Sequence, residues 1–162
     1  MKKEKTEKTN VMRLLDSLSI SYQIYEYDSE KAVSCKEVAA ILSQDVEQVF
    51  KTLVTIGKSG EHYVFVVPGE GNLDLKKAAK ASGEKFIEMI PQKDLLPLTG
   101  YIHGGCSPIG MKKKFETFID ETAQLFDTIF VSGGKRGVQI EISPLDLQQA
   151  TDAAFIDITE DK

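Results

Sequence analysis

Seven residues near the middle of the chain, Gly104–Gly110 (Gly-Gly-Cys-Ser-Pro-Ile-Gly), have the composition of a specialised loop. Three glycines and a proline restrict the backbone to a tight path that few other residues can follow. Such a loop can present its N–H groups to an oxyanion or a phosphate, or it can be an ordinary surface turn. The separation of Gly105 and Gly110 fits a phosphate-binding loop, but Met111 occupies the position where that motif requires lysine. The segment therefore argues against nucleotide hydrolysis and leaves an anion-binding loop and a surface turn as alternatives.

A second glycine-rich segment, Val131–Gly137 (Val-Ser-Gly-Gly-Lys-Arg-Gly), carries two adjacent cations between predicted strands. Hairpin turns often have this composition. Lys135 and Arg136 would also suit a phosphate or a carboxylate, which arginine can bind through two parallel hydrogen bonds. The presence of two such loops in one small chain favours a binding site formed by both.

Lys51 lies within a mostly apolar run, Val49–Val54, that is typical of a β-strand. A lysine in a strand often protects an exposed sheet edge. Alternatively, its side chain points into a cleft as the one cation of an apolar wall, where it can stabilise developing negative charge. The sequence alone leaves both interpretations open.

Cysteine and histidine offer little further chemistry. His103 and Cys106 have a ligand-like spacing, but a structural zinc site needs four ligands, and Cys35 and His62 lie in unrelated predicted elements. Cys106 as a nucleophile with His103 as its base is an alternative, although neither a serine–histidine–acid order nor a carboxylate pair stands out. The residues therefore predict neither a metal site nor a cofactor.

Hydrophobic periodicity and capping residues predict the elements that must position these groups. Helices are expected after Thr9–Asn10, after Ser34 (which forms a capping box with Glu37), from Asp74 to Gly83, and after Ser143–Pro144. Strands are expected at residues 22–27, 49–56, 63–67, 86–90, 100–103, 117–120, 129–131, 138–142 and 155–158. Because helices and strands are interleaved without a regular βαβ period, the predicted fold class is α/β of the mixed α+β kind, with helices packed around a mixed sheet.

Length and charge limit the classes of protein to which this chain can belong. Its 162 residues predict one domain, and its net charge of −5 argues against a general nucleic-acid binder. Residues 137–162 carry a net charge of −5, whereas residues 51–136 carry +2, which is compatible with a local anionic ligand. No apolar run is long enough for a transmembrane helix, the charged residues 1–10 do not form a secretory signal, and two cysteines are too few for a disulfide framework. A cytoplasmic protein without a membrane partner is therefore expected.

Five ordered motifs resemble those of one known family. They are Phe50–Leu53, Leu73–Lys77, Thr99–Tyr101, Gly104–Gly110 and Val131–Gly137. From about Lys8 to Ile158, the chain is similar to the bacterial Cys-tRNA(Pro) deacylases of the YbaK/EbsC type. The resemblance implies a single domain at residues 9–158 with a barrel-like mixed sheet surrounded by helices, after a disordered or frayed tail at residues 1–8. It also implies an editing enzyme that acts in trans on the acceptor end of Cys-tRNA(Pro), and of Cys-tRNA(Cys), with prolyl-tRNA synthetase as a candidate partner.

The resemblance also assigns roles to individual residues. Lys51 corresponds to the lysine associated with activity, Tyr27 to the tyrosine placed after the first strand, and Ser132 to a pocket residue in the second loop. Substrate contacts are expected from Tyr27, Thr52, Tyr101, Gly104, Gly105, Cys106, Ser107, Pro108, Ile109, Gly110, Ser132, Gly133, Gly134, Lys135 and Arg136.

The implied mechanism explains why no catalytic triad is found. The thiolate of the substrate cysteine attacks its own ester carbonyl and expels the tRNA as a cyclic thiolactone forms, which is formally a lyase reaction. The protein then needs only to orient the thiol, stabilise charge and exclude water. Lys51 is expected at the carbonyl or the terminal phosphate, and the Gly104–Gly110 backbone at the oxyanion.

Two positions depart from the family pattern. Gln139 stands where some members carry an aspartate, so an acid–base role there is in doubt, and Glu141 is the only local substitute. Position 106 varies in the family, so Cys106 is not expected to be catalytic. Two alternatives stay open: hydrolysis of another small aminoacyl-tRNA by a bound water, and a catalytically silent module that binds tRNA or a synthetase.

Overall fold

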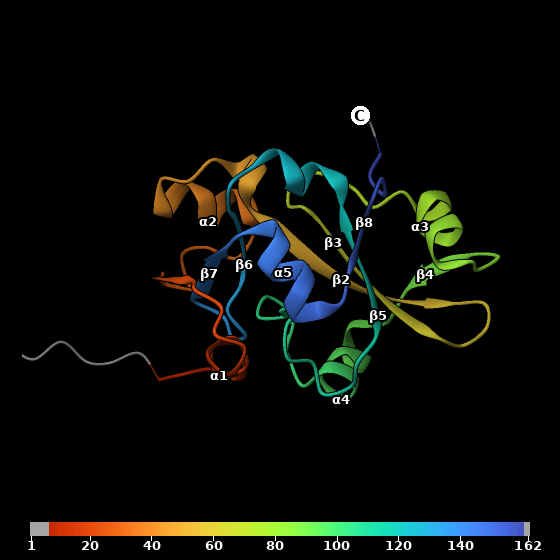
Figure 1. Cartoon of the computed structure of the whole chain (residues 1–162), viewed down its shortest axis with the longest axis horizontal. Helices are drawn as coiled ribbons and strands as arrows, with labels where there is room; N and C mark the ends of the chain where they lie inside the picture. Colours follow the sequence, from red (N-terminus) through yellow and green to blue (C-terminus); the bar gives the residue numbers. More distant parts are fainter. Residues whose placement is uncertain (1–6, 161–162) are drawn as a thin grey trace, which may run out of the picture.

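The computed structural model describes residues 7–160, which form two β-sheets with helices packed around them (Figure 1). The α-helices of this part of the chain are α1 (Asn10–Ser17), α2 (Cys35–Leu42), α3 (Leu75–Ser82), α4 (Leu95–Thr99) and α5 (Pro144–Thr151). The strands are β1 (Gln23–Glu26), β2 (Phe50–Gly57), β3 (His62–Pro68), β4 (Ile87–Met89), β5 (Glu116–Asp120), β6 (Ile129–Ser132), β7 (Val138–Ile142) and β8 (Ala154–Ile156). Short 3-10 helices lie at Val46–Gln48, Gln92–Asp94 and Glu121–Leu125. The predicted mixed α/β class is confirmed.

The larger sheet has the strand order β4-β2-β3-β5-β8. Its β2 and β3 form an antiparallel hairpin, whereas β5 pairs in parallel with both β3 and β8. The smaller sheet, β1-β7-β6, is antiparallel. One parallel bridge between Val49 and Phe130 joins the two sheets. The described strands therefore make two linked sheets that do not close into one barrel.

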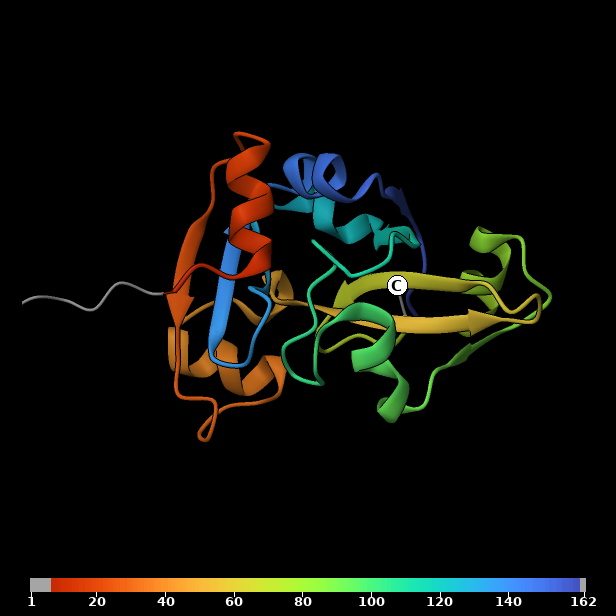
Figure 2. The ribbon, with the colours of Figure 1, turned by 90° about the horizontal axis from the view of Figure 1, so that it is seen from below.

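The two sheets lie at different places along the molecule. Figure 2 shows the smaller sheet with α1 and α2 at one end, and the β2–β3 hairpin extending from there toward α3 and β4. The larger core cluster contains the fully buried Leu15 of α1 together with Ile119 of β5 and Ile140 of β7. A second cluster contains Phe65 and Phe118, whose rings stack 5.4 Å apart. Apolar burial thus fixes each end of the molecule and the strands that run between them.

The helix ends follow the predicted capping residues. In α2 the Ser34 hydroxyl accepts from the Glu37 N–H at 3.1 Å, and the Glu37 carboxylate accepts from the Ser34 N–H at 3.1 Å, so the capping box is confirmed. Asp74 caps α3, and Gly83 ends it with a left-handed φ of 77°. Ser143 caps α5, whose first residue is Pro144.

The strand predicted at residues 100–103 is wrong. Gly100 instead ends α4 with a φ of 84°, a conformation that a β-strand does not use. The hydroxyl of Thr99 then accepts a hydrogen bond from the Tyr101 N–H at 3.0 Å, and residues 100–103 belong to neither sheet.

The predicted tail at residues 1–8 lies mostly outside the described residues. The structure describes two residues of this tail, Glu7 and Lys8. Both are exposed, and Lys8 forms an ion pair with Asp16 of α1. Among residues 7–160, no helix is long and apolar enough to cross a membrane.

Candidate functional site

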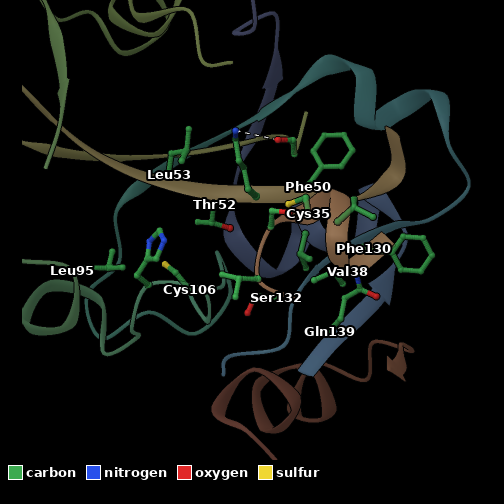
Figure 3. Close-up of a pocket in the computed structure, with 18 of the residues that line it drawn as sticks. Cys35, Val38, Phe50, Thr52, Leu53, Leu95, Cys106, Phe130, Ser132 and Gln139 are labelled. Atoms are coloured by element: carbon green, nitrogen blue, oxygen red, sulfur yellow. Dashed lines mark hydrogen bonds between the residues drawn. The ribbon is translucent and has the colours of Figure 1, made fainter. Parts of the chain in front are cut away.

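A cavity of about 740 Å³ opens where the two sheets meet. Its walls come from β2, the first turn of α2, the β6–β7 hairpin, and the loop that follows α4. Figure 3 shows Thr52, Cys106 and Ser132 grouped in this cavity, with Cys35, Val38 and Gln139 farther along it. Each wall therefore comes from a different part of the sequence, and most of the lining is apolar.

Lys51 lies in the cavity wall on β2. At this position β2 pairs with β3 through Lys51 and Val67, so the residue is not at an unpaired sheet edge on that side. Its side chain is half-buried, and its Nζ donates a hydrogen bond to the carbonyl of Gly69 at 3.2 Å. This geometry favours the interpretation in which Lys51 is a cation in the wall of a cleft. Among the described residues that line the cavity, it is the only lysine or arginine.

Five further predicted contact residues line the same cavity: Tyr27, Thr52, Gly104, Cys106 and Ser132. The hydroxyl of Thr52 is buried and has no hydrogen-bond partner among the described residues. The hydroxyl of Ser132 accepts from the Gly134 N–H at 3.3 Å. Burial raises the pKa of Tyr27, so its phenol stays neutral at ordinary pH. The cavity thus offers one ammonium and several neutral hydroxyl groups.

The other predicted contact residues do not line the cavity. They are Tyr101, Gly105, Ser107, Pro108, Ile109, Gly110, Gly133, Gly134, Lys135 and Arg136. Most of them build the two glycine loops. Tyr101 is buried, and its hydroxyl donates to the carbonyl of Ile109 at 2.5 Å, which closes the first loop from beneath.

The two glycine loops pack directly against each other. Arg136 donates from Nε to the carbonyl of His103 at 2.8 Å. A Cβ at Gly105 would lie 2.9 Å from both the Arg136 nitrogen and the Lys135 Cα, so the two backbones touch there and leave no space for a side chain. The side chains of Lys135 and Arg136 remain exposed next to the loop that borders the cavity. The two loops therefore form one packed unit, of which Gly104, Cys106 and Ser132 reach the cavity lining.

Cys106 does not have the properties of a nucleophile. Burial raises the pKa of its thiol to about 12, so the reactive thiolate is rare at neutral pH. His103 also lines the cavity, but no hydrogen bond joins its ring to the thiol among the described contacts. Within residues 7–160, no group of three or more histidine, cysteine or acidic side chains is arranged to hold a metal ion.

The sequence did not place Cys35 in the cavity, and it singled out Gln139 only as a departure from the family pattern. Cys35, the first residue of α2, lines the wall beside Lys51, and burial raises the pKa of its thiol while the nearby Lys51 lowers it. Gln139, which is 3% exposed, also lines the cavity and forms a reciprocal amide pair with Gln44, at 2.7 and 3.0 Å. Glu141, considered as a substitute acid, instead accepts hydrogen bonds from Tyr25 and Thr128 and is not part of the lining. The glutamine at position 139 was the only signal of these features in the sequence, because the contacts of Cys35 and Gln139 join distant parts of the chain.

Comparison with known proteins identifies the family. A family model described as an aminoacyl-tRNA editing domain matches residues 29–150, and the chain belongs to this family. The chain is 48% identical to a protein of Enterococcus faecalis named "Putative Cys-tRNA(Pro)/Cys-tRNA(Cys) deacylase EbsC", over 98% of this chain and 97% of that protein. A segment of 100 residues, 62% of this chain, is 32% identical to 17% of a proline–tRNA ligase of Nitrosomonas eutropha.

A solved structure shares the fold along most of the chain. It is described as "a putative trans-editing enzyme for prolyl tRNA synthetase", and its TM-score with this chain is 0.85 at 26% identity. The match covers 94% of this chain and 96% of the other. The predicted resemblance to the tRNA-editing family is thereby confirmed.

Proposed function

We propose that the protein is a trans-acting editing enzyme that removes cysteine from Cys-tRNA(Pro), and also from Cys-tRNA(Cys). The observation that carries the proposal is a mostly apolar cavity in which Lys51 is the only lysine or arginine among the described lining residues. The name of the 48% identical relative supports the same substrates. The similarities to a proline–tRNA ligase and to a trans-editing enzyme support prolyl-tRNA synthetase as a functional partner.

The chemistry of the cavity supports attack by the substrate's own thiol. Burial raises the pKa of both protein thiols in the lining, Cys35 and Cys106, so neither is a ready nucleophile. The carboxylate of Glu37, also in the lining, accepts the two N–H groups of the α2 cap. In the proposed step the substrate sulfur loses its proton and bonds to the ester carbonyl carbon. The bond to the ribose oxygen then breaks, that oxygen takes up a proton, and a cyclic thiolactone leaves.

In this mechanism the protein stabilises charge and orients the reacting groups. The ammonium of Lys51 faces the developing oxyanion or the terminal phosphate, and its effect is strong because the surrounding wall is mostly apolar. The backbone N–H groups of Gly104 and Cys106, which make no hydrogen bond with the rest of the described chain, are the loop donors available for the oxyanion. Tyr27, Thr52 and Ser132 shape the pocket around the aminoacyl group.

The test compares Cys-tRNA(Pro) and Ala-tRNA(Pro) in single-turnover deacylation by the wild type and by Lys51→Ala. We expect rapid loss of the cysteinyl ester alone, and a fall of about 100- to 1,000-fold in Lys51→Ala, the usual effect of removing one oxyanion-stabilising donor. Lys58→Ala is the matched control, because Lys58 is an exposed lysine in the turn between β2 and β3 and does not line the cavity.

Each other outcome points to a different function. Equal loss of both esters would indicate attack by water and a broader editing role, since alanine has no thiol. Failure to cleave either ester would favour a module that only binds tRNA or a synthetase.

A further inference from the structure

The ammonium of Lys51 is held by a backbone carbonyl at the edge of the cavity. Its Nζ donates to the carbonyl of Gly69 at 3.2 Å, and no other hydrogen bond of this Nζ is made within the described chain. Gly69 follows the last residue of β3, and its own N–H donates to the carbonyl of Val49 at 2.8 Å. Gly69 is therefore fixed to the start of the same strand region that carries Lys51.

Gly69 has to be a glycine because of the space around it. A Cβ at this position would lie 2.1 Å from the Cβ of Cys35, 2.5 Å from its Sγ, and 3.1 Å from the Val49 carbonyl oxygen. Its φ is not in the left-handed region, so the backbone conformation alone would accept other residues. Cys35, for its part, is the first residue of α2 and is held by the Ser34–Glu37 capping box. The first turn of α2 and the segment after β3 are thus in direct contact at these two residues.

We infer that Gly69 is the positioning residue of Lys51, and that its contact with Cys35 holds the Gly69 carbonyl where it fixes the ammonium. A lysine side chain has several rotatable bonds and loses considerable entropy when it is held in one geometry. The Gly69 carbonyl takes one of the three N–H donors of the ammonium and leaves two for the substrate. The entropy cost of ordering the lysine is met during folding, so the side chain does not have to be ordered when the substrate reacts. The inference rests on the proposed catalytic role of Lys51.

The first test is Gly69→Ala, whose added Cβ cannot fit unless the loop after β3 or the start of α2 moves. We expect a fall of about 10- to 100-fold in the single-turnover rate on Cys-tRNA(Pro) with little change in KM, because a misplacement of about 1 Å can cost that much. Gly71→Ala is the matched control. Gly71 lies in the same loop with an ordinary φ, and a Cβ there would meet its nearest atom, the Pro68 carbonyl oxygen, at 3.4 Å, an ordinary contact.

A second-site substitution shows whether Cys35 is the contact responsible. In the Gly69→Ala background, Cys35→Gly removes both the Cβ and the sulfur that the new methyl group would meet, whereas Cys35→Ala leaves the Cβ at 2.1 Å. We expect Cys35→Gly to restore at least tenfold of the lost rate and Cys35→Ala to restore much less. Equal rescue by both, or no rescue by either in a protein that remains folded, would overturn the inference.

Two further measurements separate positioning from a general structural effect. In the Lys51→Ala background, Gly69→Ala should cause no additional loss of rate, because its effect passes through the lysine; an additional tenfold loss would overturn the inference. Independently of activity, acetylation of Lys51 by acetic anhydride, followed by mass spectrometry, should be several-fold faster in Gly69→Ala than in the wild type or in Gly71→Ala. If the wild type deacylates no tRNA, the proposed function fails, while unchanged acetylation in Gly69→Ala would refute the positioning of Lys51 by itself.

Discussion

The proposed effect of Lys51 depends on the residues around it. A charged ammonium in a mostly apolar wall interacts with a second charge more strongly than it would in water. The neutral groups of the lining, among them Thr52 and Ser132, can orient a substrate without competing for that charge. Among the described lining residues, the positive charge of lysine and arginine is therefore concentrated at one atom, the Nζ of Lys51, and Glu37 supplies a carboxylate.

The cavity thiols give a prediction at the same scale. At pH 8 a free thiol with a pKa of about 9 is roughly one-tenth ionised, whereas the pKa of about 12 that burial gives Cys106 leaves about one part in ten thousand as thiolate. We therefore expect iodoacetamide to label Cys106 about a thousandfold more slowly in the folded protein than in urea, as followed by mass spectrometry. Labelling of the folded state should rise about tenfold per pH unit and level off only near pH 12. Comparable rates in the folded and unfolded states at pH 8 would contradict the assignment of Cys106 as an inert wall residue.

The candidate site residues could be recognised in the sequence where an unusual local pattern surrounds them. The glycine loops and Lys51 are visible because each lies in an unusual stretch of residues. Cys35 and Gln44 are not, because their importance comes from contacts with Gly69 and Gln139, which lie far along the chain. A single sequence has no local feature that reports such contacts.

At the scale of elements, the loop after α4 is held in shape by one buried and one exposed hydrogen bond. Tyr101, 6% exposed, donates to the Ile109 carbonyl, and the side chain of Asn10 donates to the Gly110 carbonyl at 2.7 Å. Because α1 and Tyr101 both hold this loop, the first helix affects the cavity without lining it. The contribution of Tyr101 is therefore to stability and loop shape, which differs from the substrate contact that the sequence predicted.

Tyr101→Phe tests this assignment. The substitution leaves the Ile109 carbonyl without its buried donor, and we expect the free energy of unfolding in urea to fall by about 1–3 kcal/mol. Tyr22→Phe is the control, because that hydroxyl bonds the exposed carboxylate of Asp16, and it should cost less than about 1 kcal/mol.

The pH dependence of the stability of Tyr101→Phe tests whether burial raises the pKa of this phenol. Burial raises the pKa of Tyr101 in the folded state to about 12, so above pH 10 the unfolded chain ionises first and the folded state loses stability. Tyr101→Phe should lack this contribution and lose less stability between pH 10 and pH 12. A larger loss than in the wild type would contradict the burial of the phenol.

Helix ends were predictable where a capping residue or a terminating glycine lies beside them in the sequence. Side-chain hydrogen bonds cap the start of α2 at the Ser34–Glu37 box and the start of α3 at Asp74, and Gly83 ends α3. These contacts are local, so the helix ends follow from neighbouring residues. The segment around Tyr101 misleads because Tyr101 is buried beneath a loop and not in a sheet, while the neighbouring Ile102 is exposed. The burial of Tyr101 comes from tertiary packing under the loop. A strand-like sequence pattern cannot distinguish such packing from the pairing of strands in a sheet.

At the scale of the whole molecule, two small sheets meet so that their junction encloses the candidate binding site. A cavity of about 740 Å³ lies in the range of pockets that enclose drug-sized ligands, which are larger than a cysteinyl group. The junction thus has room for the terminal ribose as well as the amino acid. The net charge of −5, however, gives the chain as a whole no attraction for a polyanionic tRNA. We therefore expect binding to depend on a few cations close to the cavity.

Lys135 is the cation best suited to test this dependence. It is exposed in the second glycine loop, whereas the neighbouring Arg136 is engaged with the His103 carbonyl. Each phosphate neutralised on a single strand contributes about 0.7 to the slope of log affinity against log salt concentration. We expect Lys135→Ala to weaken binding of Cys-tRNA(Pro) several-fold at low salt, to reduce that slope by about 0.7, and to leave the single-turnover rate at saturation unchanged. Lys58→Ala, which removes an equally exposed lysine from the β2–β3 turn, should change neither quantity. An unchanged slope in Lys135→Ala would mean that the acceptor end approaches the cavity from the side away from the glycine loops.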